Sequence, residues 1–162
     1  MQAAPGTYFV MDVDNLVRAD LSYCRSLTYR TDVLIRNRFS QHPHLAVAAC
    51  GIILADSEAA RAFVQRAADY ILDAFQTGHV AWFLDQIALT MAMRELQADQ
   101  AVKLKVSQLP RTLLDWDFIA ESAVWTGKGK RRFKNQRYQA EYNRYAEQFH
   151  LMQMNRSNSL SV

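Results

Sequence analysis

The first residues in the sequence whose side chains could form a binding site are two aspartates, which directly follow a short apolar run. Tyr8–Met11 is typical of a strand buried on both faces, and Asp12 and Asp14 follow it. Because side chains alternate along a strand, this spacing predicts two carboxylates on one face, at the strand end where open α/β sheets bind ligands. Such oxygens suit Mn²⁺ or Mg²⁺, which would neutralise a phosphate or diphosphate. The spacing also occurs at plain strand-to-turn boundaries, where an Asp caps the next segment.

A second group with binding chemistry lies late in the chain. Lys128 and Lys130 alternate with Gly127 and Gly129, and the glycines free the backbone beside the two ammonium groups. Residues 128–137 contain six Lys or Arg and no acid. A run of this kind binds phosphates, nucleic acid or acidic lipid, or is a solvated surface.

A third candidate is the pair Asp85 and Gln86, which falls in the first turn of a helix predicted over residues 82–98. A carboxylate there could act as a general base on a hydroxyl, or hydrogen-bond a bound sugar. The alternative is that Asp85 only complements the positive end of the helix dipole.

The elements that must position these residues alternate between strands and helices. Apolar runs predict strands at residues 8–11, 31–35 and 45–54, and three- and four-residue spacing predicts a helix over 57–77, with Ser57 as its N-cap and Gly78 as its stop. Residues 102–106 alternate between apolar and polar, which indicates an edge strand closed by Pro110. An aromatic stripe, spaced for one helix face and expected to pack, comprises Tyr138, Tyr142, Tyr145, Phe149 and Met152. We therefore expect an α/β chain with a mostly parallel sheet flanked by helices.

Length and composition limit the class of protein. With 162 residues, half of them apolar and 22% charged, the chain should form one globular domain, over residues 1–154, with a disordered tail at 155–162. No apolar run is long enough to span a bilayer and the N-terminus does not resemble a signal peptide, so we expect a cytoplasmic protein. Cys24 and Cys50 should be buried free thiols.

The order of these motifs resembles the second half of a GT-A glycosyltransferase, most closely bacterial glycosyltransferase-like domains that are sometimes attached to tetratricopeptide repeats. The resemblance rests on five segments, which are Tyr8–Asp14, Ala48–Gly51, Trp82–Leu89, Leu109-Pro110 and Trp125–Lys130. It implies an incomplete GT-A (Rossmann-like) fold and a metal-dependent transferase that uses a nucleotide sugar and an acceptor.

By the same resemblance, Asp14 would bind Mn²⁺ or Mg²⁺ directly and Asp12 would bind the metal or the ribose. Asp85 and Gln86 would lie beside the donor sugar and acceptor. In such enzymes the late Gly/Lys loop reaches the diphosphate.

In this sequence that loop is Gly127, Lys128, Gly129 and Lys130, and the resemblance implies that its positive charge would stabilise a leaving diphosphate. Only eleven residues precede Asp12, so the resemblance implies that a nucleotide-binding half is missing. We expect negligible sugar transfer by this chain alone, and self-association or a partner chain over the exposed sheet.

Two other functions fit parts of the sequence. A phosphatase of the haloacid dehalogenase type also begins with apolar residues and Asp-x-Asp, although Asn15-Leu16 fits its pattern poorly. A basic nucleic-acid or protein binding module could use Trp125, Phe133 and Tyr138 between cations. The acidic remainder of the chain argues against nucleic acid.

Overall fold

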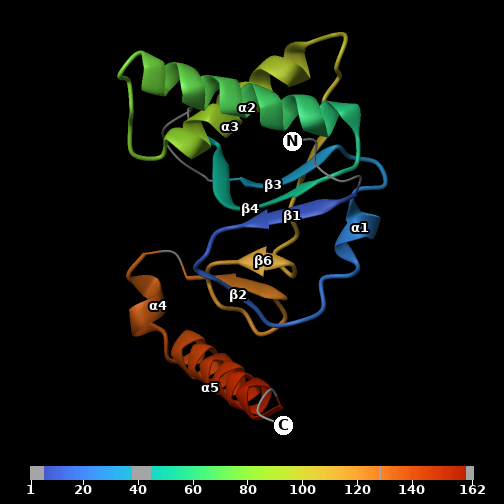
Figure 1. The fold of residues 1–162 in the computed structure, drawn as a ribbon. Coiled ribbons are helices and arrows are strands. Elements are labelled where there is room, and N and C mark those ends of the chain that lie inside the picture. Colours follow the sequence, from blue (N-terminus) through green and yellow to red (C-terminus); the bar gives the residue numbers. More distant parts are fainter. Residues whose placement is uncertain (1–5, 38–44, 128, 160–162) are drawn as a thin grey trace.

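The computed structural model describes residues 6–37, 45–127 and 129–159, and within them it forms an α/β fold (Figure 1). The elements are, in chain order, β1 (Tyr8–Met11), β2 (Asn15–Val17), α1 (Cys24–Leu27), β3 (Val33–Asn37), β4 (Val47–Leu54), α2 (Glu58–Gln76), α3 (Leu84–Ala98), β5 (Val106–Gln108), β6 (Leu114–Asp115), β7 (Val124–Thr126), α4 (Arg131–Lys134) and α5 (Gln136–Ser159). The α/β class predicted from the sequence is confirmed.

The strands form two mixed sheets, so the expected predominance of parallel pairing is wrong. Sheet A has the order β1-β4-β3-β5, with β4 antiparallel to β1 and β3, and β5 parallel to β3. Sheet B has the order β2-β7-β6, with one antiparallel and one parallel pairing. Residues 38–46 connect β3 to β4, and this connection is too short for the crossover that two neighbouring parallel strands need. The apolar sequence of β4 therefore reflects burial on both faces of the sheet. It does not indicate whether the strand pairs parallel or antiparallel with its neighbours.

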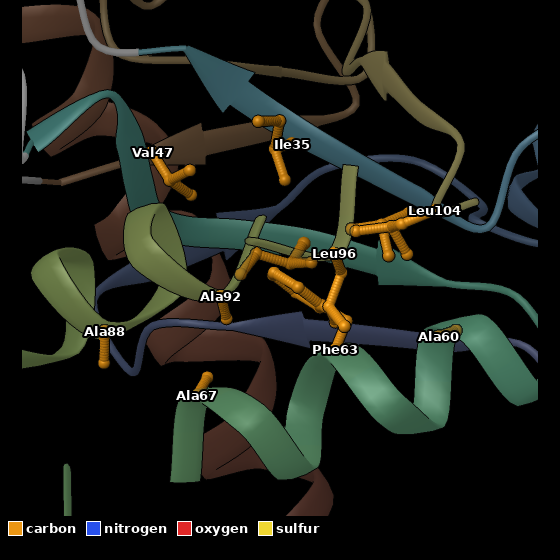
Figure 2. Close-up of a cluster of buried hydrophobic side chains, with 11 residues drawn as sticks. Ile35, Val47, Ala60, Phe63, Ala67, Ala88, Ala92, Leu96 and Leu104 are labelled. Carbon is orange, nitrogen blue, oxygen red and sulfur yellow. The ribbon is translucent and has the colours of Figure 1, made fainter. Parts of the chain in front are cut away.

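Helices α2 and α3 cover one face of sheet A and form the larger hydrophobic cluster (Figures 1 and 2). Phe63 lies at its centre and is fully buried. As predicted, Ser57 is the N-cap of α2, where its Oγ accepts a hydrogen bond from the Ala60 N–H at 3.1 Å. Gly78, with φ +74°, follows the helix and reverses the chain.

The other face of sheet A packs against sheet B, and one glycine allows a close contact there. A Cβ at Gly51 in β4 would lie 2.6 Å from Leu114 Cδ1 and 3.1 Å from a Phe9 ring carbon. Cys24 and Cys50 are buried free thiols in this second cluster, which confirms their prediction.

Two predicted elements are displaced by backbone conformation. The edge strand expected at residues 102–106 is β5 at Val106–Gln108, because Lys103 has a left-handed φ of +51° that no strand accommodates. Similarly, α3 begins at Leu84, two residues later than expected, because Phe83 has φ +71°.

Helix α5 lies against sheet B only near its start. Tyr138 is buried and Tyr145 half-buried, whereas Tyr142, Phe149 and Met152 are more than half exposed, so packing of the aromatic stripe is confirmed only in part. Figure 1 shows α5 extending away from the sheets. Residues 155–159, which the sequence assigned to a disordered tail, continue the helix because no Gly or Pro interrupts it. Residues 160–162 lie outside the described residues.

No helix in the described part of the chain combines the length and apolar character that crossing a membrane requires.

Candidate functional site

The Asp-x-Asp segment forms a turn that connects the two sheets. The Asn15 N–H donates to the Asp12 carbonyl at 3.2 Å, and the exposed Val13 stands at the tip. The Asp12 N–H and the Asn15 side-chain amide both donate to the carbonyl of Cys50 in β4. Because the chain turns here, the side-chain alternation of a strand does not govern the two carboxylates.

Asp14 is held through its backbone by residues distant in sequence. Its carbonyl accepts hydrogen bonds from the Gly127 N–H at 3.0 Å and the Tyr138 hydroxyl at 3.2 Å. A Cβ at Gly127 would lie 2.5 Å from that hydroxyl and 2.8 Å from the Asp14 carbonyl oxygen. Gly127 is therefore required for this close approach.

The Asp14 carboxylate has one paired and one unpaired oxygen. The Arg132 guanidinium lies 3.4 Å from Oδ2. In contrast, Oδ1 is buried and has no hydrogen-bond partner among the described residues. An unpaired buried carboxylate oxygen is costly, and such an atom calls for a water or an ion.

Two further unpaired oxygens lie beside this turn. Asn15 and Thr126 are register partners across β2 and β7, and within the described ranges both Asn15 Oδ1 and Thr126 Oγ1 are buried without a partner. Cross-strand partners lie side by side, so the end of sheet B next to Asp14 is rich in unused oxygen acceptors.

These donors fit a hard divalent cation that obtains most of its ligands elsewhere. The described residues contain no group of three His, Cys, Asp or Glu placed to hold a metal. Mg²⁺ commonly binds one or two carboxylates and takes its other ligands from waters and substrate phosphates. Asp14 Oδ1, with Asp12 in the same turn, matches that pattern.

The remaining predicted residues of the Gly/Lys loop are less involved. Gly129 has φ +69° and Lys130 is exposed, with no contact to Asp14 among the described residues. Lys128 lies outside the described residues. The cation that reaches Asp14 is Arg132, which the sequence marked only as part of the basic run.

Asp85 and Gln86 lie at the same end of sheet A as the Asp12 turn. The Val47 N–H donates to Thr90 Oγ1 in α3, while the Leu104 N–H donates to the Leu96 carbonyl near the other end of that helix. The N-terminus of α3 therefore points toward the start of β4, at the end of sheet A where β1 also ends. In Figure 1, α3 lies above sheet A, whereas α4 lies below it on the side of sheet B. Asp85 is exposed, Gln86 is buried, and neither has a described contact with Asp14.

The aromatic residues proposed for a nucleic-acid module are mostly unavailable. Trp125 and Tyr138 are 3% and 4% exposed and pack with Phe118 in a third hydrophobic cluster. Phe133 is exposed, but one ring does not form a stacking platform.

Neither the known protein families, nor the curated proteins, nor the solved structures contain a match to this chain. The function of the protein must therefore be inferred from its own residues and their geometry.

Proposed function

We propose that the Asp12–Asn15 turn and residues 127–132 bind the diphosphate of a nucleotide sugar together with Mn²⁺ or Mg²⁺, in a glycosyltransferase-like site. The observation that carries this proposal is the buried Asp14 Oδ1, which lacks a partner among the described residues although Gly127 and Tyr138 fix the Asp14 backbone. The bound cation would supply charge neutralisation for the diphosphate.

The chain's own residues would supply the rest of the site. Arg132, about one third exposed, can turn from Asp14 Oδ2 to a phosphate oxygen once a cation occupies the carboxylate. Lys130, and Lys128, which lies outside the described residues, contribute two further positive charges to this loop. Asp85, exposed at the same end of sheet A, would hydrogen-bond the sugar or accept the proton of an acceptor hydroxyl.

Calorimetric titration of Mn²⁺ in the presence of UDP tests the proposal. A site with two half-buried carboxylates and few other protein ligands should bind at about millimolar Kd, or about 4 kcal/mol. Asp14→Asn should weaken binding at least tenfold and Arg132→Gln should weaken UDP binding alone. Asp69→Asn, which removes an exposed carboxylate on α2, should change neither. Equal affinity in Asp14→Asn and Asp69→Asn would refute the site.

The same preparations distinguish transfer from phosphatase chemistry. Nucleotide release from UDP- or GDP-sugars that is lost in Asp14→Asn would establish turnover at this site. Release of phosphate from a simple phosphate ester, lost in Asp12→Asn, would instead favour the haloacid dehalogenase interpretation, in which the first Asp is the nucleophile.

A further inference from the structure

A cleft at the opposite end of sheet A has no part in the proposed function. It has a volume of about 890 Å³ and lies between the α1 region, the starts of β1 and β3, and the segment that leads from β4 into α2. β1 begins at this end and the Asp12 turn follows its other end, so the strand separates the two places.

Three cations line this cleft, and two of them are available to a ligand. They are Arg25, Arg30 and Lys105, all exposed. Arg30 lies over the Tyr29 ring at 5.9 Å. Within the described part of the chain, neither the Arg25 guanidinium nor the Lys105 ammonium has an ion pair or a side-chain hydrogen bond.

The two acids of the cleft are already satisfied by other groups. Asp32 accepts from the Ser57 hydroxyl at 2.8 Å through one oxygen and from the Lys105 N–H at 2.9 Å through the other. Asp56 is paired with Arg61 at 2.9 Å. Only the Asp56 charge is neutralised by a cation, so Arg25, Arg30 and Lys105 outweigh the single remaining carboxylate of Asp32. The net charge of the cleft is therefore positive, which favours an anion.

A second hollow of about 510 Å³ adjoins the cleft, since Thr7, Ser22, Arg25 and Asp56 line both. Its other lining residues include the apolar side chains of Phe9 and Leu21. The pair of hollows can hold an anionic group beside Arg25 and an apolar group next to it.

We propose that this cleft binds a phosphorylated small molecule, with the phosphate on Arg25 and Lys105 and a small apolar portion toward Phe9 and Leu21. A phosphate dianion matches one guanidinium group and one ammonium group better than a single carboxylate does. The site requires no metal.

Titrations with inorganic phosphate and with phenyl phosphate, followed by amide chemical shifts, test the proposal. They are run with EDTA at constant ionic strength, with sulfate as a third anion. Both phosphate probes should saturate, and phenyl phosphate should bind several-fold more tightly. Arg25→Gln and Lys105→Gln should each weaken binding about tenfold. Lys103→Gln, the same charge change two residues away and outside the cleft, should leave it within twofold.

The proposal would be overturned by no saturable binding of either probe or by equal loss in Lys103→Gln and Lys105→Gln. A loss confined to Lys130→Gln would move binding to the basic loop and would overturn it too. Equal shifts with sulfate at every position would indicate general screening and also reject it. Asp14→Asn should bind both probes normally, so failure of the glycosyltransferase-like site and failure of this cleft are separable.

Discussion

The hydroxyl of Tyr138 connects the candidate site to the third hydrophobic cluster. It donates to the Asp14 carbonyl, while its ring packs against Phe118 with centroids 5.0 Å apart. Burial raises the pKa of Tyr138 above its ordinary value, and the nearby Asp14 carboxylate raises it further. The phenol therefore stays protonated and able to donate when an exposed tyrosine would ionise.

Tyr138→Phe should make the stability of the protein less sensitive to alkaline pH. Because the folded-state pKa is raised, the phenol contributes stability below the unfolded pKa of about 10, and this contribution is lost as pH rises through the folded pKa. At pH 7 the variant should lose about 1 kcal/mol with the hydrogen bond. Urea unfolding at pH 7, 9 and 11 should show this difference shrinking above pH 10.

Tyr142→Phe is the matched control, since Tyr142 is exposed and its hydroxyl makes no described hydrogen bond. Burial also raises the pKa of Tyr23, and a hydrogen bond to Glu95 raises that of Tyr70. Both tyrosines are present in the wild-type protein, in Tyr138→Phe and in Tyr142→Phe, so their contributions cancel when the stabilities are compared. A Tyr138→Phe difference that stays constant from pH 7 to 11 would contradict the assigned shift.

At the scale of elements, one serine connects α2 to the strands beneath it. The Ser57 hydroxyl caps the helix and donates to Asp32, and Asp32 in turn accepts the Lys105 N–H just before β5. The first turn of α2 is thus held to the starts of β3 and β5 through two side chains.

Ser57→Ala should lower the free energy of unfolding by about 1 to 2 kcal/mol, since it removes the N-cap and leaves Asp32 short of a donor. Ser107→Ala, on the exposed side of β5, should change it by less than about 0.5 kcal/mol. Urea midpoints of the two variants measure both effects. Equal midpoints would mean that the capping bond contributes nothing.

Elements with a strong repeating pattern were predictable from the sequence. Helix α2 was recognised by its apolar spacing and its Ser57 cap, and β1 and β4 by their continuous apolar runs. The strands of sheet B have only two or three residues each, too few to show a period, and were missed.

The candidate site was predictable only in the parts that carry a motif. Asp14 and Gly127 both belong to motifs that stand out in the sequence, and in the structure the Gly127 N–H donates to the Asp14 carbonyl. The contact of Arg132 with Asp14 spans 118 residues of sequence, and one basic residue among six has no pattern that singles it out. Thr126 carries no signal in the sequence, because its place opposite Asn15 depends on the pairing of β2 with β7.

At the scale of the whole molecule, β3 and β4 belong to two hydrophobic cores at once. Ile35 and Ile52 face the cluster under α2 and α3, while their neighbours Leu34 and Ile53 face the cluster shared with sheet B. Loss of either core would expose one face of the same two strands, which couples the stability of the two sheets.

Unfolding should therefore be one transition in variants that damage either core. Phe63→Ala, in the helix-side cluster, should cost about 3 to 5 kcal/mol, and Leu113→Ala, in the cluster between the sheets, about 2 to 5 kcal/mol. Far-UV circular dichroism, which tracks the helices, and tryptophan fluorescence, to which the buried Trp125 contributes, should give the same midpoint in each. Separate midpoints would show two independent units.

Gly51 sets the thickness of the layer between the two sheets. Because glycine has no side chain, Leu114 and Phe9 can pack directly against the backbone of β4. Any other residue at position 51 would act as a wedge, since its side chain would push sheet A and sheet B apart. Residues 12–14 bridge that gap in a single tight turn and cannot lengthen. A wedge at Gly51 would therefore strain the bridge at the residues proposed to hold the cation, so a core position without any polar side chain adjusts the geometry of Asp14.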